Sequence, residues 1–97
     1  APDAVRCVVK SIVKNDINLE WRRNTDDTAA YRVEYRANGA AVAGKVIIIS
    51  QPASGKTVRG VIPDLVSPDN VLIDIKAVDS AGNISARQNE ALAGCSN

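Results

Sequence analysis

The sequence predicts an all-β protein, a seven-stranded antiparallel β-sandwich, on three observations. Apolar residues recur at every second position through much of the chain, which is the period of a strand with one buried face. With one Trp, two Tyr and no Phe or Met in 97 residues, the core must be built mainly from aliphatic side chains, and the β-branched ones favour strands. Turn signals separate about seven such segments at the spacing expected of a sandwich.

The strands are expected in segments that alternate or that form short apolar runs. In chain order these segments are 5–9, 17–21, 31–35, 46–49, 58–62, 71–79 and 84–92. Asn38-Gly39 predicts a tight hairpin turn, because both residues tolerate positive φ. Gly82 marks a second tight turn within 79–83, and the two prolines of 63–70 predict an ordered loop.

Positions that face inward in these strands form the predicted core. The predicted core residues are Ile17, Leu19, Trp21, Tyr31, Val33, Tyr35, Ile62, Leu65, Val71, Ile73, Ile75 and Ala77. All the aromatic side chains belong to this set, so none is expected on the surface.

The order and spacing of the segments resemble a fibronectin type III domain over nearly the whole chain. Ile-Asn-Leu-Glu-Trp at 17–21 is similar to the second strand with its core Trp, and Tyr-Arg-Val-Glu-Tyr at 31–35 is similar to the third. The sixth strand is matched by 71–79, with Leu65 before it, and the turn that follows is similar to those of modules attached to bacterial secreted enzymes. The resemblance implies an immunoglobulin-like fold and a single domain over 1–97, one module of a larger protein.

One position departs from the family pattern. The family usually has a Tyr where this chain has Val71, and the hydroxyl of that Tyr pins the preceding loop. Valine cannot form this bond. We therefore expect the loop to be held by Pro63, Pro68 and the side chains of Asp69 or Asn70.

Composition argues against several classes of function. With a net charge of +1 and scattered Lys and Arg, the sequence predicts no basic patch for binding nucleic acid. The longest apolar run, 46–49, is far shorter than the roughly 18 residues of a membrane span, so no membrane insertion is expected. The absence of His removes the commonest general base and metal ligand, and neither an enzyme nor a cofactor is expected.

Two cysteines lie near the two ends, Cys7 and Cys95, and an even count permits one disulfide. The fold that the resemblance implies places them about 20 Å apart by counting residues along the strands. Three alternatives remain: the tail returns along the body, the predicted register is shifted, or the thiols do not pair. A disulfide favours an extracellular or cell-surface location.

Several polar residues are candidates for small-ligand or modification sites. Carboxylates with Asn83 nearby could bind calcium, or Asp79 could accept N–H bonds within its own turn; those considered are Asp26, Asp27, Asp74 and Asp79. Asn83-Ile-Ser85 is a glycosylation sequon that turn geometry explains equally well. Ser-Gly-Lys-Thr at 54–57 lacks the upstream glycine of a phosphate loop and is interpreted as a surface turn.

The apolar run is the main candidate interaction edge, and it comprises Val46, Ile47, Ile48 and Ile49. On an edge strand, one face of this run would point outward and could contact a neighbouring domain or another protein by strand addition; alternatively, 40–44 covers it. The sequence therefore predicts a non-catalytic spacer or interaction module. One alternative is a carbohydrate-binding or adhesion module attached to a secreted glycoside-active enzyme, with a polysaccharide partner. Another is a virion or appendage component.

Overall fold

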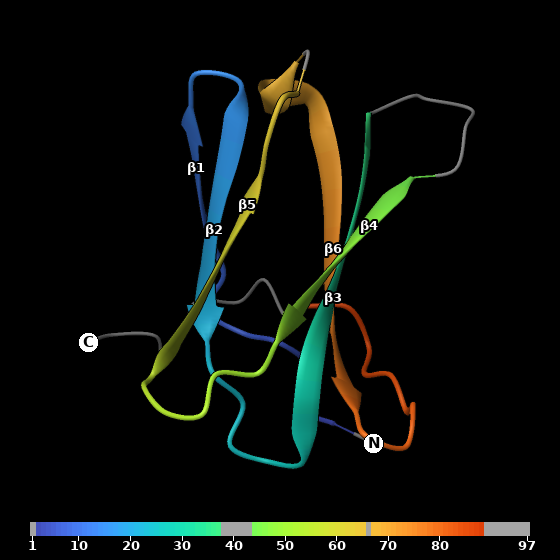
Figure 1. Ribbon diagram of the computed structural model, residues 1–97. Coiled ribbons are helices and arrows are strands. Elements are labelled where there is room, and N and C mark those ends of the chain that lie inside the picture. Colours follow the sequence, from blue (N-terminus) through green and yellow to red (C-terminus); the bar gives the residue numbers. More distant parts are fainter. Residues whose placement is uncertain (1, 38–43, 66, 89–97) are drawn as a thin grey trace.

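The computed structural model describes residues 2–37, 44–65 and 67–88 of the chain. Within these ranges the chain forms strands and one short 3-10 helix, and no α-helix (Figure 1). The elements are β1 (Val9–Val13), β2 (Asp16–Arg22), β3 (Thr28–Ala37), β4 (Lys45–Ser50), β5 (Thr57–Ile62), η1 (Pro68–Asn70) and β6 (Val71–Asp79). The all-β prediction is therefore confirmed.

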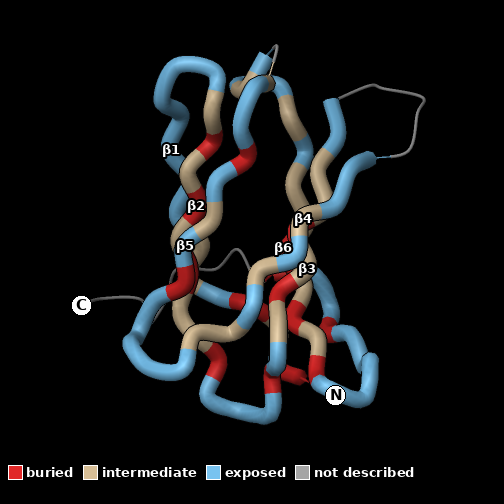
Figure 2. The backbone as a smooth tube through the Cα atoms, in the orientation of Figure 1, coloured by how far each residue is buried: buried red, intermediate tan, exposed pale blue. Residues whose placement is uncertain are grey.

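The strands of the described ranges form two antiparallel sheets of three strands each. One sheet has the order β1-β2-β5 and the other the order β4-β3-β6. The two sheets lie side by side as two layers (Figure 1), and buried positions occur on strands of both sheets (Figure 2). The outer faces carry the exposed and half-buried positions of each strand.

The core forms because the inward positions of both sheets carry large apolar side chains. In β2 every second residue is buried, and Ile17, Leu19 and Trp21 point inward. Trp21 contacts Tyr31 of the opposite sheet edge to face, with ring centroids 5.4 Å apart. The buried apolar residues are Val5, Ile17, Leu19, Trp21, Tyr31, Val33, Val58, Ile62, Ile75 and Ala77. Among the remaining predicted core residues, Tyr35, Leu65, Val71 and Ile73 are only partly buried and pack against this cluster.

The first strand begins later than predicted. Arg6 accepts a hydrogen bond from the Arg22 N–H at 3.2 Å, but Cys7 then takes a φ of 61°, which interrupts the extended chain. Pairing with β2 resumes only at Val9. The predicted first strand at 5–9 was therefore wrong in its bounds, although Val5 itself is fully buried.

The described part of 84–92 contains no strand. Ile84 forms a single bridge to Val78, and 89–92 lie outside the described residues. Two side chains instead bond to the edge of β6. Ser85 donates its N–H to the Ala77 carbonyl and accepts the Ala77 N–H at its hydroxyl, both at 2.8 Å.

Gln88 continues this pattern one step further along β6. Its Oε1 accepts the N–H of Ile75 at 2.8 Å, and its Nε2 donates to the carbonyl of Ile73 at 3.0 Å. The side-chain amide thus makes the two bonds that a strand residue would make. Polar side chains therefore occupy at least part of the edge where a seventh strand was expected.

The loop before β6 is held differently from the expectation. Leu65 donates its N–H to the carbonyl of Asn15 at 2.8 Å, and Asp64 donates to Asp16 Oδ1 at 3.1 Å. These bonds fasten the loop to the β1–β2 turn. Pro63, Pro68, Asp69 and Asn70 were the expected anchors, and Asn70 donates its N–H to the carbonyl of Ser67 at 3.0 Å. The predicted Asn38-Gly39 turn lies outside the described residues.

The Gln88 bonds lead to a stability prediction. Gln88→Ala should lower the free energy of unfolding by about 1–3 kcal/mol, because two backbone groups next to the core lose their partners. Gln88→Glu keeps an acceptor for Ile75 but, while ionised, has no donor for Ile73. The difference in free energy of unfolding between wild type and Gln88→Glu should therefore shrink as the pH falls and the new carboxyl group is protonated. Urea unfolding at pH 7 and pH 4, each referred to wild type, measures both effects; equal stability of wild type and Gln88→Ala would contradict the assignment.

Candidate interaction surface

β4 is an edge strand, and its outward positions are apolar. Among the described residues its only strand neighbour is β3. Ile47 and Ile49 pack against the core, whereas Val46 and Ile48 point to the outer face and are 44% and 61% exposed. The structure thus divides the four predicted edge residues into an inner pair and an outer pair.

The hydrogen-bonding direction of β4 follows from one bond just beyond its end. The N–H of Gln51 donates to the Ala29 carbonyl at 2.9 Å. Because bonded and non-bonded pairs alternate in an antiparallel ladder, Lys45, Ile47 and Ile49 also bond toward β3. The N–H and C=O groups of Val46, Ile48 and Ser50 therefore face away from the sheet. A strand arriving at this edge would meet these groups.

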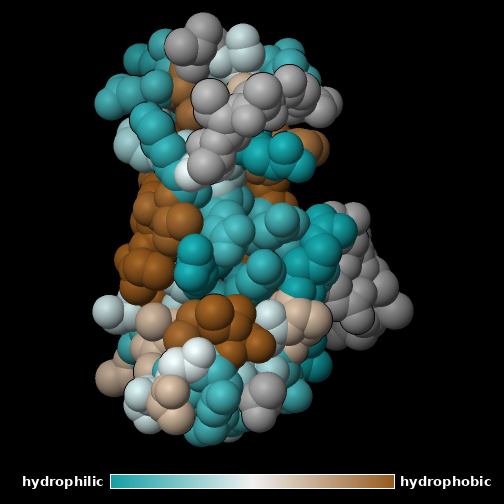
Figure 3. All heavy atoms as spheres, turned by 90° about the vertical axis from the view of Figure 1, so that its right-hand side faces the viewer, coloured by the Kyte–Doolittle hydropathy of each residue, from teal (hydrophilic) through white to brown (hydrophobic). Residues whose placement is uncertain are grey.

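The middle of the outer face of this sheet is charged. Arg32 and Glu34 lie beside Ile48 and Val46 in the β3–β4 register. Arg32 Nε is 2.9 Å from Glu34 Oε1, and Lys76 Nζ is 3.9 Å from the same oxygen. Figure 3 shows hydrophobic atoms along the left side of this face and hydrophilic atoms beside them across its middle. Apolar side chains at the sheet edge are thus bordered by charges of both signs.

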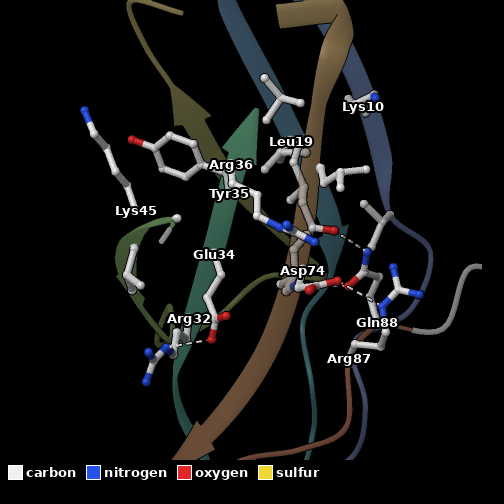
Figure 4. Close-up of a pocket in the computed structure, with 17 residues that line it drawn as sticks. Lys10, Leu19, Arg32, Glu34, Tyr35, Arg36, Lys45, Asp74, Arg87 and Gln88 are labelled. Atoms are coloured by element: carbon white, nitrogen blue, oxygen red, sulfur yellow. Dashed lines mark hydrogen bonds and ion pairs between the residues drawn. The ribbon is translucent and has the colours of Figure 1, made fainter. Parts of the chain in front are cut away.

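A cavity of about 860 Å³ opens between the two sheets near this face. Its apolar lining comes from both layers and includes Leu19, Tyr35 and Ile75 (Figure 4). Charged side chains also line it, and they are Lys10, Arg32, Glu34, Arg36, Lys45, Asp74 and Arg87. Both carboxylates of this set are engaged in ion pairs, Glu34 with Arg32 and Asp74 with Arg87, each at 2.9 Å. The cavity therefore has no unpaired carboxylate poised for acid–base chemistry among the described residues.

Asp79 organises the turn that follows β6. Its Oδ1 accepts the N–H groups of Ala81 and Asn83 at 3.0 and 2.8 Å, and its Oδ2 accepts the Asn83 side-chain amide at 2.9 Å. The hydrogen bond from the Asn83 side chain, followed by that from its backbone, lowers the pKa of Asp79 below its ordinary value. Gly82 takes a φ of 90° at the tip of the turn. Asn83, the sequon residue, is exposed but bonded to Asp79 through its amide nitrogen.

The other calcium candidates are held apart. Burial of Asp26 tends to raise its pKa, but hydrogen bonds from the Asp3 backbone and from Thr28 outweigh it, and the net pKa is lowered. Asp74 forms the ion pair with Arg87 described above. No group of three or more metal-ligating side chains occurs within 2–37, 44–65 and 67–88. Within the segment 54–57, residues 54–56 form an exposed bend with Gly55 at a φ of 98°, and Thr57 begins β5.

The remaining candidates are placed as follows. Trp21 and Tyr31 are fully buried, and Tyr35 is half-buried at the cavity. Cys7 is partly buried, and Cys95 lies outside the described residues, so their pairing remains a prediction. Sequence reasoning missed the roles of Ser85 and Gln88, because side chains that bond to a strand edge leave no periodic signal.

No protein-family model matches the chain, and no curated protein is significantly similar to it. Among the described residues, no helix has both the length and the apolar character needed to cross a bilayer.

The Asp79 turn leads to a prediction about acid stability. Since the folded-state pKa of Asp79 is lowered, its contribution is present above the unfolded pKa of about 3.9 and is lost as the pH falls through the folded value. Asp79→Asn should therefore be less stable than wild type at pH 6, and the two should converge toward pH 2. Urea unfolding between pH 2 and pH 7 measures the difference, with Asp27→Asn as the matched control. A difference in free energy of unfolding between wild type and Asp79→Asn that stays constant from pH 2 to pH 7 would contradict the prediction.

Proposed function

We propose that the chain is a non-catalytic, immunoglobulin-like β-sandwich module of the fibronectin type III kind. It acts as a spacer or protein-interaction domain within a larger extracellular or cell-surface protein. The observation that carries the interaction role is the edge strand β4, whose outer face presents Val46 and Ile48 beside outward-facing backbone groups. Exposed apolar side chains on an accessible strand edge suit them for a contact by strand addition.

The grouping of strands supports the immunoglobulin-like part of the proposal. The first, second and fifth strands share one sheet, and the third and sixth pair in the other, as do strands A, B, E and C, F of that fold. A seventh strand would belong beside β6, where Ser85 and Gln88 bond to the edge. The resemblance drawn from 17–21, 31–35 and 71–79 is in keeping with this order.

The non-catalytic part rests on side-chain chemistry. The sequence has no His, and four of the carboxylates that could replace it as a base are engaged by other groups. Glu34 and Asp74 are in ion pairs, and Asp26 and Asp79 accept hydrogen bonds within their own loops. The hydrogen bonds lower the pKa values of Asp26 and Asp79, which favours the ionised form of these two acids over a proton-transfer role.

Carbohydrate binding is the alternative function. Sugar-stacking sites need exposed aromatic rings, and the accessible candidate among the three is Tyr35 at the cavity. Addition of soluble polysaccharides should leave the emission of the buried Trp21 and the chemical shifts of the Tyr35 ring unchanged. A saturable change in the Tyr35 ring signals would favour the carbohydrate module over the interaction module.

The extracellular assignment is tested through the cysteines. We expect Cys7 and Cys95 to be paired, so the native protein should take up no alkylating reagent until it is reduced. Mass measurement with and without reductant decides this directly. Reduction should also lower the free energy of unfolding, by about 4–5 kcal/mol if loop-closure entropy dominates. Two alkylatable thiols in the native protein would contradict the pairing and weaken the extracellular assignment.

The interaction role is tested by charging the β4 face. In the isolated chain, Ile48→Lys should change the melting temperature little, because the side chain is exposed. In the longer protein that contains the module, the same change should lower the melting temperature of the module, since a docked neighbour would be lost. Val61→Lys, on the outer face of β5 and 49% exposed, is the matched control. If Ile48→Lys acts identically in both contexts, β4 contacts no neighbouring domain.

A further inference from the structure

We propose that β4 is also a self-pairing edge, at which a second copy of this chain adds its own β4 antiparallel about a two-fold axis at Ile47. In this arrangement Val46 lies opposite Ile48 of the partner subunit, and Ile47 lies opposite its own counterpart. The inference rests on the interaction role proposed above and names the partner. It follows from the direction of backbone bonds, from the face on which each side chain lies, and from the order of charges on the sheet.

Backbone geometry restricts the register. In one continuous sheet, residues directly opposite each other point to the same face. Val46 and Ile48 share the outer face, and both direct their N–H and C=O groups away from β3. Val46 can therefore form a doubly bonded pair with the partner's Ile48, and the two-fold axis repeats that pair. Four outer apolar side chains then form one cluster across the junction.

Charges on the neighbouring strand select this register over the next one. Glu34 lies beside Val46, and Arg32 lies beside Ile48. With the axis at Ile47, each row across the junction reads Glu34, Val46, the partner's Ile48, the partner's Arg32. The row has an acid at one end and a base at the other. Adjacent strands are about 4.8 Å apart, so the two charged residues are about 14 Å apart at their Cα atoms, with the apolar pair between them.

Moving the axis to Ile48 removes this complementarity. Ile48 would then lie opposite itself, and Arg32 of both copies would end the same row. Val46 would lie opposite Ser50 of the partner subunit, which breaks the apolar cluster. The first register therefore pairs opposite charges and buries more apolar surface.

A second copy suits this edge because the row is self-complementary. An isologous contact requires that the same surface match itself after a two-fold rotation, and a row with opposite charges at its ends does so. The net charge of +1 gives little repulsion between copies. β4 also contains no Pro or Gly, and its single charge is Lys45 at the start of the strand, so the strand itself carries few of the residues that disfavour edge pairing. A contact between two short strands is smaller than a standard interface of about 1,600 Å², so the dimer should be weak and concentration-dependent.

Sedimentation velocity of the 97-residue chain, from about 10 μM to about 1 mM, tests the dimer. We expect the weight-average mass to rise toward that of a dimer over this range. Ile48→Lys should weaken association at least about tenfold, and Val61→Lys, the matched change on the other sheet, should leave it unchanged. Circular dichroism establishes that both variants are folded. A wild-type chain that stays monomeric at 1 mM overturns the dimer, while the melting comparison in the longer protein still decides the interaction role separately.

The register is tested by a charge-swap cycle and by amide exchange. Arg32→Glu and Glu34→Arg each place like charges at the ends of both rows, so each should weaken the dimer. The double variant restores opposite charges and should recover wild-type affinity. On dimerisation, the amides of Val46, Ile48 and Ser50 should gain protection against hydrogen exchange, whereas that of Ile47 should not. Equal dimer affinity for wild type, both single variants and the double variant would overturn the proposed register. Amide protection on dimerisation that does not include Val46 and Ile48 would also overturn it.

Discussion

The edge-to-face contact between Trp21 and Tyr31 joins the two sheets, and the rest of the structure is arranged around it. Trp21 lies on β2, Tyr31 lies on β3, and both are fully buried. The Tyr31 hydroxyl accepts the N–H of Asn24, so the polar tip of the ring is paired inside the protein. Asn24 in turn donates its amide to the Asp3 carbonyl and accepts from Gln51 just after β4. One aromatic pair thus positions the start of the chain, the β2–β3 loop and the end of β4.

The two edge strands of the β4-β3-β6 sheet differ in whether their outward backbone groups are bonded. Along β6, outward-facing backbone groups are met by the N–H and hydroxyl of Ser85 and by the side-chain amide of Gln88. Along β4, the described residues supply no such cover, and Val46 and Ile48 face outward. Paired backbone groups resist strand addition, whereas exposed ones favour it. This difference is why the interaction role is assigned to β4 and not to β6.

Five of the strands could be predicted from the sequence to within about three residues, because alternation along a half-buried strand is a local signal. The segment 71–79 coincides with β6, and 17–21 lies within β2. The first strand was misplaced because nothing in the sequence shows that Cys7 adopts a positive φ. For the candidate edge, the sequence predicts the apolar character but not the directions of the side chains. That 46–49 is apolar is visible in the sequence, but which two side chains point outward depends on the register with β3.

The sequence by itself determined the strand period, the aliphatic core and the absence of His, since these depend only on residue type and spacing. Tertiary structure alone decided which strands became neighbours and which edges were covered. Backbone N–H and C=O groups are the same at every residue, so their partners depend on what the fold brings alongside. The Gln88 amide reaches Ile73 and Ile75 from 13 to 15 residues away, and the Asn15 carbonyl, in the β1–β2 turn, accepts the N–H of the distant Leu65. For the same reason, the outward direction of Val46 and Ile48 became visible only once β3 was in place.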